Sequence, residues 1–229
     1  MTPEAFPPAG TTRHRVFLVD DHPLVREWLG SLIERQPDLA VCGQAETSGA
    51  AYAAIVRLQP DVAVVDLSLE DGSGLELIKQ LQALPQPPRV LVLSMHDEAI
   101  YAERALRAGA AGYVMKRSAT GRIIDAIRQV LQGRLYISEA VSEKMAEKFV
   151  LARTQPDASP VALLSDREME VFQLIGQGFE NRRIAETLHL SPKTVQVYCG
   201  RIKEKLGLEN ATALIGEAVR WHEHQHRTV

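Results

Sequence analysis

Residues 16–23, Val-Phe-Leu-Val-Asp-Asp-His-Pro, place four apolar residues directly before two adjacent carboxylates. The apolar run is typical of a buried β-strand. Asp20 and Asp21 follow at its carboxyl end, although neighbouring like charges repel and burial deprives them of hydration. Pro23 suits the first turn of a helix. The stretch therefore predicts a strand that carries two acids to the edge of a core and leads at once into a helix.

Similar apolar runs recur along the first half of the chain, and each is followed by a stretch with helical spacing. Nearly continuous apolar runs are typical of parallel strands that are covered on both faces. Five such units predict an α/β fold with a doubly wound, five-stranded parallel sheet and right-handed crossovers. The expected strands are 16–19, 40–43, 62–65, 90–93 and 112–115, and the expected helices are 24–35, 49–58, 75–84, 100–108 and 122–131.

The remainder of the chain has a different character. Residues 138–153 form a charged amphipathic helix, and the following Thr-Gln-Pro-Asp-Ala-Ser-Pro, residues 154–160, has the composition of a linker. A small all-α domain of four helices comes next. Ser165 with Glu168 forms a capping box, Ser191-Pro192 opens the third helix, and Gly207 ends it. The four expected helices are 166–177, 182–188, 192–206 and 210–221.

These patterns divide the 229 residues into four segments. The expected boundaries are a disordered leader at 1–13, an α/β domain at 14–134, a helical linker with a flexible segment at 135–160, and a helical domain at 161–229. Cys42 and Cys199 are far apart and are interpreted as reduced thiols, which suits the cytoplasm. No window has the roughly 18 apolar residues of a membrane span, and the first residues do not resemble a signal peptide.

Polar residues stand at the carboxyl ends of four expected strands, where open α/β sheets bind their ligands. Asp20, Asp21 and Asp66 are acids, Ser94 supplies a hydroxyl and Lys116 an ammonium group. Clustered carboxylates favour Mg²⁺, and a metal-bound aspartate can act as a nucleophile toward a phosphoryl group. Asp66 is the best nucleophile because its strand is central. The lysine and the metal would neutralise the charge of the transferred group.

Each of these residues has an ordinary interpretation when it is taken alone. The acid pair suits a helix N-terminus, an aspartate at a strand end often belongs to a turn, and a lone lysine is usually solvated. One such group at the end of each relevant strand is a much rarer combination. The combination therefore favours a single site over a set of unrelated surface residues.

Four segments carry a resemblance to a known family: VFLVDDHPLVREWL, VAVVDLSLEDGSGLELI, VLVLSMHDE and ALRAGAAGYVMK. They resemble the receiver domain of bacterial two-component response regulators, which has a flavodoxin-like fold. The resemblance implies that Asp66 accepts a phosphoryl group from a sensor histidine kinase. It implies that Asp20, Asp21, Asp66 and the backbone carbonyl of Ser68 hold Mg²⁺, and that Lys116 pairs with the phosphate. Ser94 and Tyr113 would form the switch pair, in which the hydroxyl moves to the phosphate and the ring fills the vacated space.

The sequence departs from the family pattern beside the acceptor. Leu69 and Glu70 stand where the family usually has Met-Pro, whereas Gly74 matches the family glycine. The change is expected to loosen the loop and to alter the lifetime of the phosphate. His96 has two interpretations, as a residue that tunes the access of hydrolytic water and as an exposed loop histidine.

The C-terminal run LSDREMEVFQLIGQGFENRRIAETLHLSPKTVQVYCGRIKEKLGL resembles the LuxR-type helix-turn-helix of the NarL/FixJ class. Its composition agrees, because residues 182–205 contain six Lys or Arg and two Glu, a local net charge of +4 within a chain of net charge −3. Helical spacing turns Val195, Ile202 and Leu206 of the recognition helix toward the core. The outward positions are then available to a DNA major groove, and they are Lys193, Gln196, Val197, Gly200, Arg201 and Lys203.

The expected DNA contacts differ in kind. Lys193, Thr194, Arg201 and Lys205 suit phosphates, which provide affinity and salt dependence. Gln196 suits an adenine edge, and Val197 a thymine methyl group. Gly200 costs about 1 kcal/mol in mid-helix, and related proteins often have a longer side chain there. The helix at Gly200 therefore either reads fewer bases or approaches the DNA backbone more closely.

Together these features predict a cytoplasmic transcriptional regulator that is switched by phosphorylation and binds double-stranded DNA. We expect no membrane partner, no enzymatic role beyond its own phosphoryl transfer and dephosphorylation, and a homodimer when it is active, because one weakly basic domain would bind weakly. An Mg²⁺-dependent phosphohydrolase is one alternative, but Ser68 stands where a general-acid carboxylate is usual and no cap insertion is present. An output domain that binds RNA or only protein is the other.

Overall fold

A computed structural model describes residues 13–69, 72–151, 160–188 and 190–226. Contacts divide the chain into two compact units, residues 1–138 and 139–229. The predicted leader, 1–13, lies outside the described residues except for Arg13, as do residues 152–159 of the predicted linker. Each unit is described by itself.

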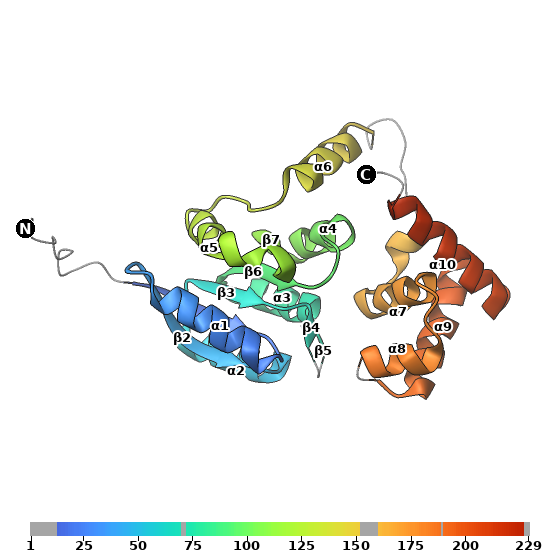
Figure 1. The fold of residues 1–229 in the computed structure, drawn as a ribbon, viewed down its shortest axis with the longest axis horizontal. Coiled ribbons are helices and arrows are strands. Elements are labelled where there is room, and N and C mark those ends of the chain that lie inside the picture. Colours follow the sequence, from blue (N-terminus) through green and yellow to red (C-terminus); the bar gives the residue numbers. More distant parts are fainter. Residues whose placement is uncertain (1–12, 70–71, 152–159, 189, 227–229) are drawn as a thin grey trace, which may run out of the picture. The chain divides into compact units, whose positions relative to one another are not determined.

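The first unit is built on a five-stranded sheet in which every pairing is parallel (Figure 1). Its order is β2-β1-β3-β6-β7, so β3 occupies the centre. The prediction of five strands that alternate with helices and pair in parallel is confirmed. The strands are β1 (His14–Val19), β2 (Leu39–Ala45), β3 (Val62–Val65), β6 (Arg89–Ser94) and β7 (Gly112–Met115).

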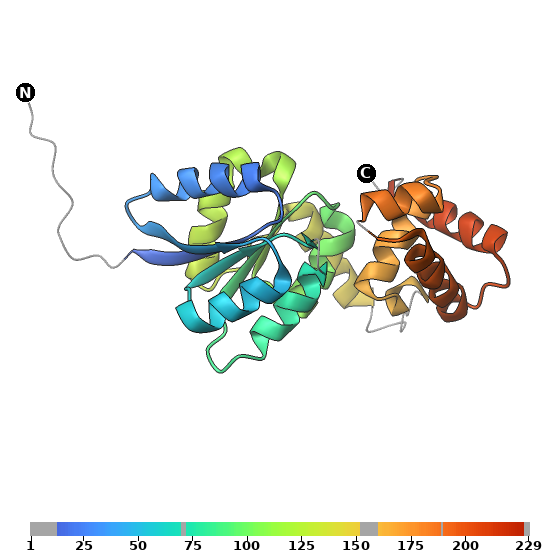
Figure 2. The ribbon, with the colours of Figure 1, turned by 90° about the horizontal axis from the view of Figure 1, so that it is seen from below.

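Helices cover both faces of this sheet, with α1 and α5 on one face and α2, α3 and α4 on the other (Figure 2). Their apolar residues explain the arrangement, because Val16, Leu18, Ile33 and Ile127 join one buried cluster between the sheet and the first pair. The helices are α1 (Pro23–Glu34), α2 (Ser48–Leu58), α3 (Gly74–Gln82), α4 (Glu98–Ala108) and α5 (Ile123–Leu131).

Three short elements were not expected from the sequence. Strands β4 (Ser68–Leu69) and β5 (Gly72–Ser73) pair antiparallel after the central strand, and Lys116 opens the 3-10 helix η1 (Lys116–Gly121). Two-residue strands and a six-residue 3-10 helix are too short for a sequence pattern to reveal their periodicity. Glu70, the departure from the family pattern, lies outside the described residues.

The boundary between the two compact units falls within the predicted linker, 135–160. Residues 135–138 belong to the first unit, because Tyr136 forms a parallel bridge with Gly112 at the edge of the sheet. The second unit starts with α6 (Glu139–Leu151).

The second unit is entirely helical among its described residues, and its predicted helix boundaries are largely confirmed. Ser165 and Glu168 form the expected capping box, Ser191 caps the third helix of the predicted domain, and Gly207 ends that helix with a φ of 66°. Its elements after α6 are η2 (Pro160–Leu163), α7 (Asp166–Gly176), α8 (Asn181–Thr187), α9 (Pro192–Leu206) and α10 (Ala211–His226).

Helix α10 continues five residues beyond its expected end at Trp221, as far as His226. Packing against α7 explains the extension. The rings of Trp221 and Phe172 lie 5.7 Å apart, and a Cβ on Gly176 would lie 2.6 Å from the carbonyl oxygen of Ala218. Glycine therefore permits a close helix crossing that holds the additional turn.

None of the helices within the described part of the chain is both long and apolar enough to cross a membrane.

Gly74 is a steric requirement of the first unit. A Cβ there would lie 2.0 Å from the carbonyl oxygen of Asp66, so Gly74→Ala must displace either α3 or the end of β3. We expect this substitution to lower the free energy of unfolding by roughly 1–3 kcal/mol in urea denaturation followed by circular dichroism. Gly72→Ala is the matched control, because its Cβ would meet only the Ser48 hydroxyl at 3.4 Å. Equal stability of the two variants would contradict the steric assignment.

Candidate functional site

The three predicted acids gather at the carboxyl edge of the sheet. Strands β1 and β3 pair with Val19 opposite Val65, so Asp20 and Asp66 leave the sheet side by side. Asp66 is only 3% exposed, Asp20 is also buried, and Asp21 is partly buried. Each of these carboxylates and the ring of His22 offers one ligand atom to a group whose atoms all lie within 4.8 Å of one another.

Lys116 joins the acids from the end of β7. Its Nζ atom lies 2.7 Å from Oδ2 of Asp20 and 2.7 Å from Oδ2 of Asp66. Burial acts to lower the pKa of Lys116, but the charge of Asp66 and the hydrogen bonds to both carboxylates outweigh it and raise that pKa above its ordinary value. The ammonium group therefore remains charged and holds the two acids together.

The carboxylate of Asp66 has a perturbed pKa. Burial raises its pKa to about 6, Lys116 opposes the shift, and the negative charge of Asp20 adds to it. A carboxylate with a raised pKa is a better nucleophile than one at its ordinary value, provided that it is ionised. Burial thus gives Asp66 a raised pKa while Lys116 stays within 2.7 Å of its carboxylate.

The donor set fits Mg²⁺. Oδ1 of Asp21 is buried and accepts no hydrogen bond, although Nδ1 of His22 lies 2.5 Å away. Oxygen ligands from one or two carboxylates are what Mg²⁺ requires, and a cation would satisfy this atom. The N–H of Ser68 donates to Oδ1 of Asp66 at 3.3 Å, which places the Ser68 peptide beside the acids.

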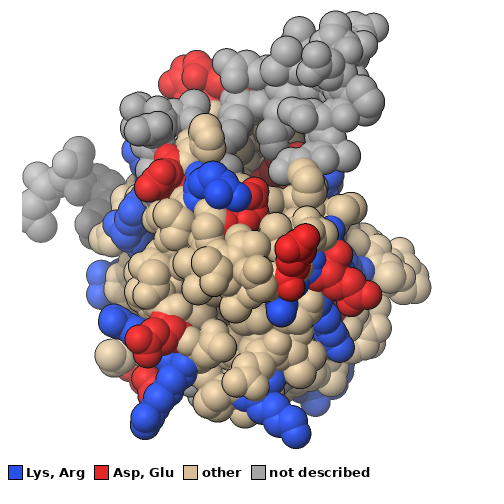
Figure 3. Space-filling model, turned by 90° about the vertical axis from the view of Figure 1, so that its right-hand side faces the viewer, with Lys and Arg blue, Asp and Glu red and all other residues tan. Residues whose placement is uncertain are grey.

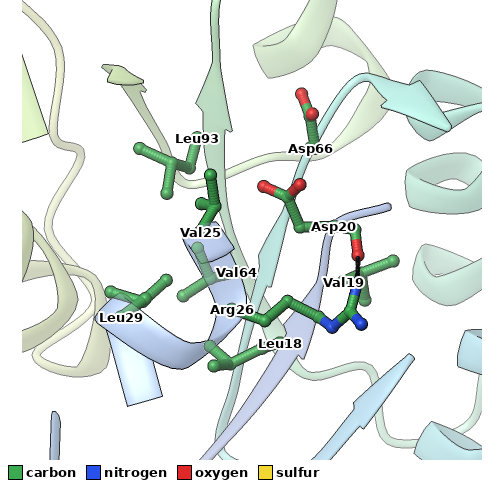
Figure 4. Close-up of a pocket in the computed structure, with 9 residues that line it drawn as sticks. All are labelled: Leu18, Val19, Asp20, Val25, Arg26, Leu29, Val64, Asp66 and Leu93. Atoms are coloured by element: carbon green, nitrogen blue, oxygen red, sulfur yellow. Dashed lines mark hydrogen bonds between the residues drawn. The ribbon is translucent and has the colours of Figure 1, made fainter. Parts of the chain in front are cut away.

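Sequence reasoning missed two residues at this edge. His22 precedes α1 without capping it through its side chain, and its exposed ring contacts the carboxylates of both Asp20 and Asp21. Arg26 lies beneath Asp20 and lines a cavity of about 10 Å³ between α1 and the sheet (Figure 4). The strand-end rule finds only residues that end strands, whereas both of these belong to the start of a helix.

Ser94 and Tyr113, the predicted switch pair, both bond the backbone of His96. Both are buried, and burial raises the pKa of Tyr113 far above its usual range, against a smaller lowering from its hydrogen bond with Ser94. The Tyr113 hydroxyl donates to the carbonyl oxygen of His96 at 3.0 Å, and the His96 N–H donates to Oγ of Ser94 at 3.2 Å. The two residues are therefore linked through the backbone of His96.

His96 is not the exposed loop residue that one interpretation assumed. It is half-buried, its ring stacks on Tyr101 with centroids 4.5 Å apart, and Nε2 lies 2.8 Å from Oγ of Ser68. The side chain thus connects the loop after β6 with the segment that follows Asp66.

Helix α9 presents the outward surface that its spacing predicted. Val195 and Ile202 are fully buried, and Leu206 is half-buried. Thr194 is half-buried, with its hydroxyl 2.8 Å from that of Ser191, and Lys203 is half-buried as well. The other predicted contact residues before Lys205 are exposed: Lys193, Gln196, Val197, Gly200 and Arg201.

Gly200 has no packing reason to be glycine. A Cβ at this position would meet nothing within 4 Å, and its φ lies outside the left-handed region. Packing within the domain therefore does not distinguish the two interpretations of Gly200, fewer base contacts and a closer approach to DNA.

Lys205 is engaged within its own domain. Its Nζ atom lies 2.6 Å from the Glu168 carboxylate and 3.3 Å from the Leu163 carbonyl oxygen. Burial raises the pKa of Glu168, but bonds to Lys205 and Ser165 outweigh it and lower that pKa overall. A phosphate contact of Lys205, as predicted, would therefore compete with its ion pair to Glu168.

The face of the second unit in Figure 3 carries Lys, Arg, Asp and Glu intermixed around a largely uncharged centre. No continuous positive surface is visible among the described residues on this face.

Comparison with known proteins identifies both units. Residues 16–128 match the response regulator receiver domain, and residues 162–218 match the bacterial regulatory proteins of the luxR family. The oxygen regulatory protein NreC of Staphylococcus carnosus is 33% identical over 211 residues, which cover 90% of this chain and 97% of that protein.

Solved structures agree with this assignment. A LuxR-family two-component response regulator from Aurantimonas is 37% identical, covers 61% of this chain and 99% of that one, and has a TM-score of 0.56. RcsB from Salmonella enterica serovar Typhimurium, bound to promoter rprA with the phosphomimetic BeF3-, is 28% identical, with coverages of 90% and 98% and a TM-score of 0.58. Another structure contains two RcsB dimers on two parallel DNAs. The chain belongs to the response regulators that join a receiver domain to a luxR-family DNA-binding domain.

Proposed function

We propose that this response regulator accepts a phosphoryl group on Asp66 from a sensor histidine kinase and thereby controls the binding of α9 to promoter DNA. The observation that carries the proposal is the buried contact of Lys116 with both Asp20 and Asp66, at 2.7 Å each. An ammonium group shared by two acids beside a third is the arrangement that phosphoryl transfer needs.

The phosphoryl transfer follows from these positions. An ionised Asp66 oxygen attacks the phosphorus of a phosphohistidine, so a P–O bond forms while the P–N bond breaks and the imidazole departs. Lys116 lies beside the attacking carboxylate, where it can pair with the phosphoryl oxygens that the acceptor gains. Mg²⁺ held by Asp20, Asp21, Asp66 and the Ser68 carbonyl would supply neutralising charge. Positioning and electrostatics, rather than covalent help from other groups, therefore account for the catalysis.

The switch begins at Ser94. Its Oγ accepts the His96 N–H, which leaves the hydroxyl proton able to donate to a phosphoryl oxygen on Asp66. Rotation of that hydroxyl would break its hydrogen bond with the His96 N–H and alter the space available to the Tyr113 ring. A local charge change would in this way bias two arrangements of the β6–α4 loop.

The chain leaves the receiver domain next to this switch. The N–H of Tyr113 donates to the carbonyl oxygen of Tyr136 at 2.8 Å, and Glu98 at the start of α4 accepts the N–H of Ser138 at 2.9 Å. Movement of Tyr113 or α4 would therefore pull on the residues that lead to α6. These bonds provide a physical route from the acceptor to the second unit.

The second unit would bind double-stranded DNA through α9. Lys193 and Arg201 would contact phosphates, with Thr194 and Lys203 at the edges of the same surface. Gln196 and Val197 would meet base edges, and Val197 is 47% exposed as such a contact requires. RcsB, a structural relative, is described bound to promoter DNA, which supports DNA over RNA or protein as the ligand.

We also propose that the active form is a homodimer in the cytoplasm. Ile215 on α10 is 52% exposed, which offers an apolar contact for a second copy of the helix. Two linked recognition helices would offset the modest charge of one. The phosphohydrolase alternative is less favoured, because Ser68 supplies no general acid, and the proposed chemistry is limited to the protein's own phosphoryl transfer and dephosphorylation.

Asp66→Asn should abolish phosphorylation. Incubation of the wild type with acetyl phosphate and Mg²⁺ is expected to add one phosphoryl group, which intact-mass spectrometry detects, whereas an amide oxygen is too weak a nucleophile. Asp61→Asn is the control, since that carboxylate is exposed and bonds the Arg15 N–H. Equal labelling of Asp66→Asn and the wild type would show that the acceptor is another residue.

Removing Lys193 and Arg201 together should weaken binding to duplex DNA and flatten its dependence on salt. Each lost phosphate contact is expected to reduce the slope of log affinity against log salt by about 1. The measurement is a fluorescence anisotropy titration at several salt concentrations. Arg220→Ala, on α10, removes an exposed cation outside the proposed surface and should leave the slope unchanged. An unchanged slope in the double variant would exclude α9 as the contact surface.

Gly200→Ala should stabilise the second unit by about 1 kcal/mol in thermal or urea unfolding, because the new methyl group meets nothing and alanine favours the helix. Loss of stability would show that the glycine has a packing role after all. The DNA affinity of the same variant separates the two interpretations of Gly200. Weaker binding would show that the helix lies so close to DNA that the added methyl group interferes. Unchanged binding would indicate that the helix reads fewer bases at this position.

A further inference from the structure

We infer that Arg26 is a positioning residue for the cation site, because its guanidinium group holds the peptide that joins Asp20 to Asp21. This inference rests on the proposed function, since it assigns a role in Mg²⁺ binding to a residue that contacts no ligand itself.

Arg26 connects the acid site with the surface. Its Nη1 atom donates to the carbonyl oxygen of Asp20 at 2.6 Å (Figure 4). Its Nη2 atom donates to the carboxylate of Glu46. The arginine is 8% exposed, whereas the side chain of Glu46 is 65% exposed. A buried arginine is costly unless its donors are satisfied, and these two contacts satisfy both ends of the guanidinium group.

The start of α1 explains how the arginine reaches this place. Arg26 is the fourth residue of a helix that begins at Pro23, and helical side chains lean toward the N-terminus. The side chain therefore turns back under the two residues that link β1 to α1. An arginine in the first turn of an exposed helix would be solvated, and would be disfavoured there by the helix dipole.

Asp20 has several other restraints, whereas Asp21 has one, the exposed ring of His22. The Asp20 N–H donates to the carbonyl oxygen of Ala45 at 3.2 Å, and its carboxylate contacts the His22 N–H and Lys116. The buried Oδ1 atom of Asp21 accepts no hydrogen bond. The Asp21 carboxylate is therefore held by an exposed histidine ring and by the preceding peptide, and Arg26 holds the carbonyl end of that peptide.

The charge of Arg26 and its positioning role predict opposite changes in Mg²⁺ affinity when the arginine is removed. A positive charge beneath the acids repels a cation, so an arginine that acted only through its charge would weaken Mg²⁺ binding, and its removal would tighten it. An arginine that orients the ligands strengthens binding, and its removal weakens it, by about tenfold or more for such supporting contacts. The sign of the change in affinity decides between the two.

The test is a calorimetric titration of the full chain with Mg²⁺ alone. Arg26→Met is expected to weaken binding by about tenfold, and Arg26→Lys, which keeps the charge but cannot span both partners, by at least about threefold. Tighter or unchanged binding in a folded Arg26→Met variant would overturn the inference. Should that variant fail to fold, Arg26→Lys decides, and unchanged affinity there would equally overturn it.

Two controls separate this inference from other effects. Arg128→Met removes another arginine of the first unit, which pairs with Asp38 away from the acids, and should lower stability while leaving Mg²⁺ affinity unchanged. Asp20→Asn should lose Mg²⁺ binding. If Asp20→Asn and the wild type bind alike, the proposed metal site itself is wrong, whereas a normal Arg26→Met beside a defective Asp20→Asn rejects only the role of Arg26.

Discussion

The contact of Lys116 with the buried carboxylates of Asp20 and Asp66 is the interaction on which the receiver site depends. Two acids at the ends of neighbouring strands repel each other, and burial makes their ionised forms more costly. One ammonium group within 2.7 Å of both reduces this repulsion while leaving Asp66 with a raised pKa of about 6. The site is therefore held together by a charge that also prepares its chemistry.

The backbone around this contact has little freedom. Gly74 brings the start of α3 against the Asp66 carbonyl, and Arg26 supports the Asp20 carbonyl from the other side. Both features cost free energy of folding, since glycine lowers helix propensity and a buried guanidinium group must be desolvated. Rigid support of this kind is what an electrostatic mechanism needs, because small displacements of charged groups change their interaction energies strongly.

The route from the site to the rest of the chain also uses backbone contacts. Tyr113 and Ser94 meet through His96, and the strand that carries Tyr113 bonds the segment that leaves the domain. The second unit then depends on its own packing, in which Lys205 joins α9 to Glu168 of α7 and Gly176 allows α10 to approach. Lys205, which the sequence predicted to contact a DNA phosphate, therefore also helps to orient the recognition helix.

The sequence by itself determined the sheet, the helices around it and the acids at its edge, because alternating apolar runs and helical spacing are local patterns. It also determined which residues of α9 face outward, since the period of a helix sorts Val195 and Ile202 from Lys193 and Gln196. Only the tertiary structure showed that Arg26 lies beneath Asp20, that His96 bonds Ser68, and that Lys205 bonds Glu168. Those contacts join residues 6, 28 and 37 positions apart through long, flexible or loop-borne side chains. Their partners are chosen by how the elements pack, and no local pattern records that choice.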